Sequence, residues 1–247
     1  MTTVKEFNRC GEELEKILLL RTSPVAVKML EKEADIPAGA MRPKKDHNYH
    51  LAQCQAFAAS RREGATIAML KEDHWCPAAL MAYGMVPVPE VSGPVKSHPY
   101  ERFEYGKYIG IVTAPLKSAT FKPDVVIVYS NTSQLRSLLL SMNLDEVPEV
   151  NGRFFPPSCG HAVVTPMLTG KCWVVLPDPG EYQRALGDEG EMMFAIPADK
   201  MAGFLVGLNK FQDQGFAYRN HNYFMLPDFP RPDFYKKMFK DWGLEDY

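Results

Sequence analysis

The chain has 247 residues and a formal net charge of -2, and 46% of the residues are hydrophobic, 23% charged and 11% aromatic. This composition is typical of a globular protein, and the interspersed charges exclude the broad basic surface that nucleic acid requires, so we expect no nucleic-acid partner. The longest apolar runs are far shorter than the roughly 18 to 20 residues that cross a bilayer, and the start lacks the apolar stretch of a signal peptide, so we expect a cytoplasmic protein with no membrane partner.

The five cysteines are an odd number at low density. Both features argue against an extracellular disulfide framework and predict reduced thiols that are buried or functional. A chain of this length buries enough apolar surface to fold without a disulfide or a metal. A metal in this protein would therefore serve chemistry rather than folding.

The N-terminal part of the chain predicts two helices and two strands. Apolar residues recur at helical spacing over 4–20, and the short β-branched run 24–30 begins with proline, as expected of a strand. The proline-free, alanine-rich stretch within 47–62 favours a helix ended by Gly64. The apolar run 65–70 then predicts a second strand.

A cysteine precedes the next predicted helix. Cys76 stands directly before Pro77, and proline is favoured at the first position of a helix, so we expect a helix over 77–83 that ends at Gly84. Cys76 would then be its N-cap residue. The segment 86–106 contains four prolines and is predicted to be a connector or a lid-like loop.

The C-terminal part continues the alternation of strands and helices. Strands are expected at 109–113, 125–129 and 172–176, and helices at 132–142, 162–168 and 199–212. The tail from residue 219 is rich in Tyr, Phe and Pro and is expected to wrap the surface, with aromatic groups that are a candidate contact for a homo-oligomer.

Interleaved strands and helices predict an α/β or α+β protein, a mixed sheet with flanking helices whose strand order does not follow from the sequence. We expect a single compact domain over 1–247, with a candidate subdivision at 86–106.

The common catalytic motifs are missing from the sequence. It contains no Gly-x-Gly-x-x-Gly, phosphate-binding loop, His-Glu-x-x-His or Gly-x-Ser-x-Gly pattern, which leaves nucleotide-binding, zinc-protease and hydrolase functions without local support. It also lacks Cys-x-x-Cys, which weakens a thioredoxin-like or zinc-ribbon interpretation. Isolated cysteines in informative places remain.

Three of these cysteines stand where a thiol could be functional. Cys76 lies at a predicted helix N-terminus, where unpaired N–H groups and the helix dipole stabilise a thiolate. Cys159 precedes an apolar, helix-like stretch, and His161 adds a nitrogen donor two residues later. Cys54 follows His50 by one turn of the predicted helix 47–62, which would place both on one face. The alternative is that all three thiols are small core groups, as Cys10 and Cys172 are expected to be.

A charged segment supplies further candidates. Asp188, Glu189 and Glu191 could provide a general base or a hydrogen-bond acceptor, and Arg184 could act as an anion clamp. The alternative is that this segment is a solvated loop. No residue can be assigned a catalytic role from the sequence, so whether the protein is an enzyme stays open.

Several segments, taken in order, resemble an uncharacterised family, domain of unknown function 169, which is found mostly in archaea and anaerobic bacteria. The resemblance spans residues 14–208. It rests on Pro24-Val25-Ala26-Val27-Lys28, the helix with Cys54, Cys76-Pro77, Pro123-Asp124-Val125-Val126, Cys159 ahead of Pro166 and Gly170-Lys171, and the stretch 184–197.

The resemblance singles out the same three cysteines, because the recurring cysteines of the family match Cys54, Cys76 and Cys159. Family members commonly carry a further Gly-Cys where this chain has Leu176-Pro177-Asp178-Pro179-Gly180, so the resemblance provides no fourth cysteine ligand here. Three thiolates in a family from anaerobes imply an iron–sulfur cluster of the [4Fe–4S] type.

The fourth position of that cluster would be open or filled by Asp178, His161 or a small molecule, and His50 is a further candidate metal ligand. Such a centre would serve redox or cluster-dependent chemistry in anaerobic metabolism, with a small-molecule substrate or a redox partner.

The same residues are compatible with three different functions. The sulfurs could hold zinc together with a histidine, or act as free thiols that form a redox disulfide. The protein could also be a metal-free module in which the loop 86–106 covers a pocket for a small ligand.

Overall fold

The structure is a computed structural model, and it describes residues 2–87, 101–142, 151–154, 156–213, 218, 231 and 233–244. Most of the predicted connector 86–106, and the tail residues 219–230, lie outside the described residues. Their predicted roles as a lid-like loop and as a surface wrap therefore stay predictions.

The described strands form one seven-stranded sheet with the order β2-β3-β1-β4-β7-β6-β5. Neighbouring strands are antiparallel except β5 and β6, which pair in parallel. This mixed, largely antiparallel sheet with flanking helices confirms the predicted fold class as α+β. The strands are β1 (Val25–Leu30), β2 (Ile67–Leu70), β3 (Gly110–Pro115), β4 (Val125–Ser130), β5 (Asn151–Arg153), β6 (Trp173–Val175) and β7 (Met192–Pro197).

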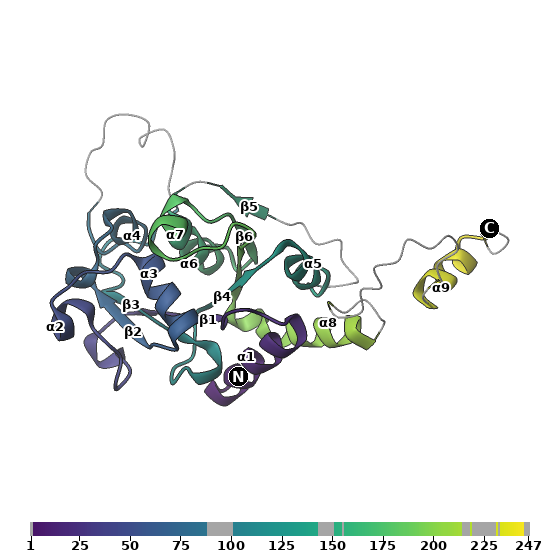
Figure 1. Cartoon of the computed structure of the whole chain (residues 1–247), viewed down its shortest axis with the longest axis horizontal. Helices are drawn as coiled ribbons and strands as arrows, with labels where there is room; N and C mark the ends of the chain where they lie inside the picture. The colour runs from purple at the N-terminus through teal and green to yellow at the C-terminus, as the bar shows by residue number, and fades with distance from the viewer. Residues whose placement is uncertain are drawn as a thin grey trace.

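Helices cover both faces of the sheet (Figure 1). On one face, above the sheet in Figure 1, lie α3 (Gln53–Ala58), α4 (Pro77–Ala82), α6 (Ser158–Thr169) and α7 (Pro179–Arg184). The other face packs against α1 (Val4–Leu18), α5 (Thr132–Leu140) and α8 (Met201–Asp213). Two further helices, α2 (Pro43–His47) and α9 (Asp233–Asp241), lie outside these two layers.

The sheet separates two hydrophobic cores. Because side chains alternate along a strand, Val25 and Val27 of β1 enter the core under α3, α4 and α6, whereas Ala26 and Leu30 enter the core over α1, α5 and α8. Every residue of the central strands β3 and β4 is buried. The continuous apolar runs seen in the sequence follow from this cover on both faces, which is unusual for antiparallel sheets.

The predicted first helix is confirmed with a shorter C-terminus. It begins with a capping box in which the Thr3 hydroxyl accepts the backbone N–H of Glu6 and the Glu6 carboxylate accepts that of Thr3. It ends at Leu18 because Leu19 adopts a left-handed conformation, with φ 51°.

The predicted helix over 47–62 is wrong in its first part. Helix α2 already ends at His47, where Asn48 turns left-handed with φ 57°, and α3 begins only at Gln53. In between, Leu51 forms a short parallel bridge with His74. After α3 the chain continues as a π-helix over Ala59–Glu63, a form that is frequent at functional sites, and it ends at Gly64 as predicted.

The sequence patterns missed three elements. Strand β7 was not expected, although it is apolar and pairs with both β4 and β6. Helix α7 replaces a predicted turn at Asp178-Pro179-Gly180, because Asp178 caps a helix that has Pro179 at its first position. The short strand β5 was also missed.

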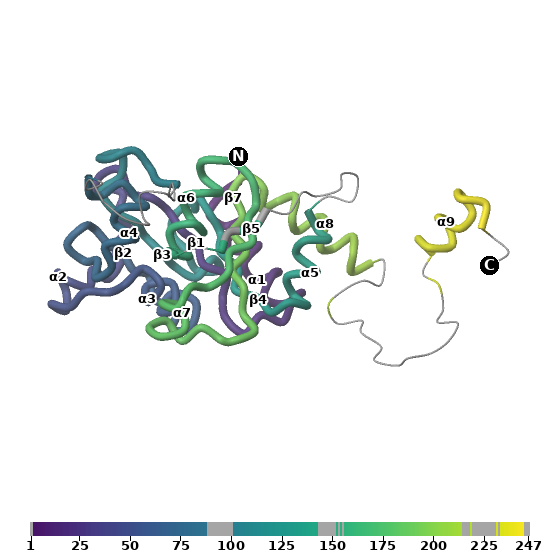
Figure 2. Tube along the Cα trace, turned by 90° about the horizontal axis from the view of Figure 1, so that it is seen from above, coloured from purple at the N-terminus to yellow at the C-terminus, as the bar shows by residue number. Residues whose placement is uncertain are grey.

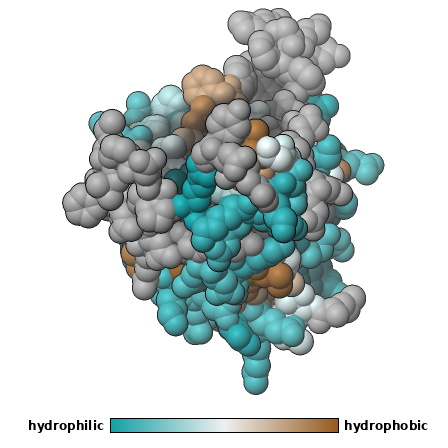
Figure 3. Space-filling view, turned by 90° about the vertical axis from the view of Figure 1, so that its right-hand side faces the viewer, coloured by the Kyte–Doolittle hydropathy of each residue, from teal (hydrophilic) through white to brown (hydrophobic). Residues whose placement is uncertain are grey.

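The C-terminal helix stands apart from the sheet. Figure 2 shows α9 beyond the end of α8, and none of its residues is buried. Figure 3 shows the side of the molecule that faces right in Figure 1. Hydrophilic residues cover much of the described surface there, and the hydrophobic ones form small separate areas. Within the described residues, no helix is both long and apolar enough to cross a membrane.

Candidate functional site

Each of the three singled-out cysteines lies at the start of a helix on the same face of the sheet. Cys54 is the second residue of α3, Cys76 is the N-cap residue of α4 as predicted, and Cys159 is the second residue of α6. Cys54 and Cys159 are buried, and Cys76 is partly exposed beside Trp75, which is 59% exposed. The group therefore extends from the interior to the surface.

The three thiols lie near one another. Cys76 packs against a small buried cluster formed by Ala52, Cys54, Ala58 and Ala185. Burial is the main cause that raises the pKa of Cys159 well above its ordinary value, and the neighbouring Cys54, Glu181, Asp178 and Cys76 raise it further. All cysteines are free, so these thiols are not paired as disulfides.

The other two cysteines lie on the opposite face of the sheet. Cys10 of α1 and Cys172 before β6 are both buried in the core that contains α1, α5 and α8. Their packing role was the expectation from the sequence, and their position gives a natural comparison with the three thiols across the sheet.

Helix α7 brings polar groups to the three thiols. The Cys54 thiol donates to the backbone oxygen of Gly180, with 3.7 Å between sulfur and oxygen. Asp178 caps two helices, because its Oδ1 accepts the N–H of Gly180 in α7 at 2.7 Å and its Oδ2 accepts the N–H of Ser158 in α6 at 2.8 Å. The first turns of α6 and α7 are thereby fixed next to each other.

Arg184, the predicted anion clamp, lies at the opposite end of α7. Its guanidinium group stands 5.2 Å from the centre of the Trp75 ring. Burial, followed by the charge of Glu181, raises the pKa of Cys54 to about 12, and a hydrogen bond and the charge of Arg184 oppose this rise. Arg184 is thus the positive charge beside the Cys54 thiol.

Glu181, in the first turn of α7, is the residue of this site that sequence reasoning missed. It is 1% exposed, and both its oxygens accept from the Tyr129 hydroxyl at 3.2 Å. Burial raises its pKa to about 7, and the charge of Asp178 adds to the rise. A pattern search could not find it, because only the unpredicted helix α7 turns it inward.

A chain of polar contacts leads from Glu181 to Glu191, one of the predicted candidates. The Arg61 guanidinium covers the Tyr129 ring at 3.9 Å and donates to both oxygens of Glu191 at 2.8 and 2.9 Å. Burial opposes it, but the hydrogen bonds from Arg61 and from the N–H of Asp188 lower the pKa of Glu191. Glu191 is therefore half of an ion pair and not a poised general base.

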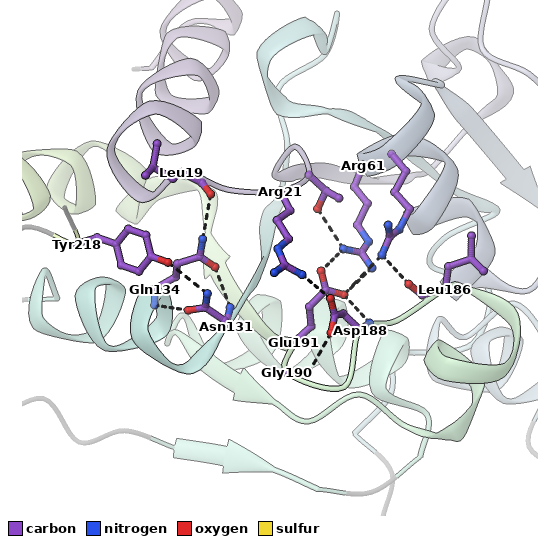
Figure 4. A network of polar contacts seen from close by, with 12 residues as sticks. Leu19, Arg21, Arg61, Asn131, Gln134, Leu186, Asp188, Gly190, Glu191 and Tyr218 are labelled. Carbon is purple, nitrogen blue, oxygen red and sulfur yellow. Dashed lines mark hydrogen bonds and ion pairs between the residues drawn. The ribbon is translucent and has the colours of Figure 1, made fainter. Parts of the chain in front are cut away.

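Figure 4 shows this ion pair together with the loop that it holds. Arg21 donates to Asp188 at 2.6 Å and Arg62 to the backbone oxygen of Leu186 at 2.6 Å, so arginines fasten the segment after α7 at both ends. A pocket of about 100 Å³ lies beside the pair and is lined by Arg21, Tyr129, Ser130, Asn131, Gln134, Asp188, Gly190 and Glu191.

The two histidine candidates do not join the thiols. His50 is exposed in the loop before α3 and not one turn before Cys54 within a helix, so the predicted shared face is wrong. His161 is buried in α6, but it lies two residues after Cys159 and so points about 200° around the helix from that thiol. The fourth buried side chain of the site is a carboxylate.

The described residues contain no group of three or more His, Cys, Asp or Glu side chains that could hold a single metal ion. The ligands of one ion all touch that ion, whereas the thiolates of an iron–sulfur cluster bind different iron atoms and stand farther apart. The spacing of Cys54, Cys76 and Cys159 thus matters for the kind of centre that they could hold.

Comparison with protein families places the chain. The model of the family described as "Uncharacterised ArCR, COG2043", domain of unknown function 169, matches residues 13–205. The chain therefore belongs to this family, which confirms the resemblance found in the sequence. Comparison with curated proteins and with solved structures gave no significant match.

Proposed function

We propose that the protein is a cytoplasmic metal-centre protein that holds an iron–sulfur cluster through Cys54, Cys76 and Cys159. One observation carries the proposal: thiols from three helices lie together on one face of the sheet, and the remaining two cysteines lie on the other face. Chance placement of core cysteines does not require this division. Free thiols also suit the reducing cytoplasm.

Buried polar atoms next to two of the thiols support the fit of a cluster. The side-chain amide of Gln53, which is 0% exposed, and the hydroxyl of Ser158, which is 1% exposed, have no hydrogen-bond partner among the described residues. Such orphaned groups are costly unless something bound satisfies them. Each directly precedes a thiol, Cys54 or Cys159, and N–H and O–H donors around cluster sulfur tune the cluster.

The chain itself prepares the site in three ways. Burial keeps Cys54 and Cys159 protonated in the metal-free protein, so metal binding must release their protons, and affinity rises with pH. Arg184 offsets part of the negative charge of the thiolates. The partly exposed Cys76 beside Trp75 marks the side from which a redox partner or a small substrate would approach. A bound cluster would supply electron transfer or, at an open iron, Lewis acidity.

The raised thiol pKa values weigh against a thiol-redox function. The thiolate is the reacting form, and a cysteine with a pKa of about 12, such as Cys54, is a poor nucleophile at neutral pH. A zinc centre and a metal-free ligand-binding module would each give a metal and sulfide content different from that of a cluster, so the same measurement separates all three.

The test uses serine variants of all five cysteines in the full-length chain, purified without oxygen. We expect Cys54→Ser, Cys76→Ser and Cys159→Ser each to lose most of the bound iron and sulfide. The buried controls Cys10→Ser and Cys172→Ser should keep the wild-type content, because they lie across the sheet. Equal content in all five variants would contradict the proposal, and zinc without sulfide would replace the cluster by a zinc centre.

A further inference from the structure

Glu181 is a buried carboxylate without a cation to balance it. It is 1% exposed, and its described partner is the Tyr129 hydroxyl, at 3.2 Å from each oxygen. No Lys, Arg or His of the described residues forms an ion pair with it. Buried charges in proteins are paired or coordinate metals, so this carboxylate calls for a positive partner.

The place of Glu181 puts it at the three thiols. It directly follows Gly180, whose backbone oxygen accepts the Cys54 thiol. Its charge is also the largest electrostatic contribution that raises the pKa of Cys54, and it contributes to the rise at Cys159. A carboxylate in this position weakens thiolate formation unless a positively charged centre lies between them.

The remaining candidates for the fourth position are committed elsewhere. Both oxygens of Asp178 cap helices α6 and α7, His50 is exposed in a loop, and His161 lies about 200° around α6 from Cys159. Among the described candidates, Glu181 is the buried oxygen donor that reaches the thiols from α7.

On the proposed function, on which this step rests, we infer that the Glu181 carboxylate is the fourth ligand of the cluster. Tyr129 then orients the ligand through its hydroxyl, and Arg61, held by Glu191, fixes the Tyr129 ring from the other side. Outer partners of this kind commonly fix a metal-bound carboxylate. The second polar layer therefore explains why Glu191 is paired and not catalytic.

The consequence is a cluster with three sulfur-ligated irons and one oxygen-ligated iron. Oxygen is a harder ligand than thiolate, so the fourth iron is electronically distinct and is released more easily on oxidation. Mössbauer spectroscopy of the ⁵⁷Fe-loaded, full-length protein measures this directly, without any activity assay.

We expect the wild-type spectrum to contain one distinct iron site in four, and mild oxidation to give the electron paramagnetic resonance signal of a three-iron cluster. Glu181→Cys should make the four irons alike and suppress the three-iron signal. Glu181→Gln should lose the distinct site, and the exposed control Glu189→Gln should leave the spectrum unchanged.

The outcomes separate this inference from the proposed function. A wild-type chain that takes up no iron and sulfide contradicts both. A wild-type cluster whose spectrum is the same in Glu181→Gln and Glu181→Cys contradicts the ligand assignment alone. Glu181→Cys keeps the test valid if Glu181→Gln does not fold.

Discussion

The buried carboxylate of Glu181 makes a quantitative prediction for the metal-free protein. Its pKa is raised from an ordinary 4.5 to about 7, mainly by burial. The folded chain therefore retains a proton between these values that the unfolded chain has released, so stability falls as the pH rises from 4.5 through 7. The shift corresponds to about 3 kcal/mol.

The perturbation is Glu181→Gln, which removes the ionisation and retains an acceptor for Tyr129. At pH 8 we expect the metal-free variant to be more stable than the wild type by about 3 kcal/mol, or about 6–12 °C in Tm for a chain of this size. At pH 4 the two proteins should differ little, because Glu181 is protonated in both states.

Urea unfolding of both proteins, stripped of metal and measured from pH 4 to pH 8, gives the free energies. The exposed Glu189→Gln should follow the wild-type curve. Parallel curves for wild type and Glu181→Gln would refute the reasoning, because they would show that the carboxylate has no unusual environment. In the iron-loaded protein the sign should reverse, since the variant loses a ligand.

Three further predictions concern the surroundings of the site and the second core. Glu191→Ala leaves the buried Arg61 guanidinium unpaired and should cost about 3–5 kcal/mol in urea unfolding, whereas a loss below about 1 kcal/mol would mean that solvent reaches the pair. Gly207→Ala places a Cβ against the backbone oxygen of Ser141, and this overpacking of α8 on the end of α5 should lower stability by about 1–3 kcal/mol; an unchanged Tm would contradict that contact. Alkylation of Cys54 at pH 7 in the folded metal-free protein should be about 1,000-fold slower than in the unfolded chain, as followed by mass spectrometry of its peptide, and equal rates would refute the raised pKa.

The sequence allowed good prediction of those elements that carry local signals. Cys76 before Pro77 indicated a helix N-cap, and the structure has α4 beginning there. The apolar runs gave β1, β2, β3, β4 and β6, and their burial on both faces explains why the runs lack a polar alternation.

The missed parts depend on contacts between distant segments. The turn residues Asp178-Pro179-Gly180 are equally typical of a loop and of a helix start, and the bond from Asp178 to Ser158 across the site accompanies the helix. Glu181 follows from that helix alone. The separation of Cys54 from His50 likewise depends on the bridge between Leu51 and His74, which no local pattern contains.

The central claim is that the three thiols hold an iron–sulfur cluster. Its most direct test is the iron and acid-labile sulfide content of the wild-type protein, expressed and purified without oxygen, together with its absorption spectrum. The account predicts iron and sulfide in about equal amounts, with a broad absorption shoulder in the visible range. Protein that was never exposed to air and contains neither iron nor sulfide would contradict it.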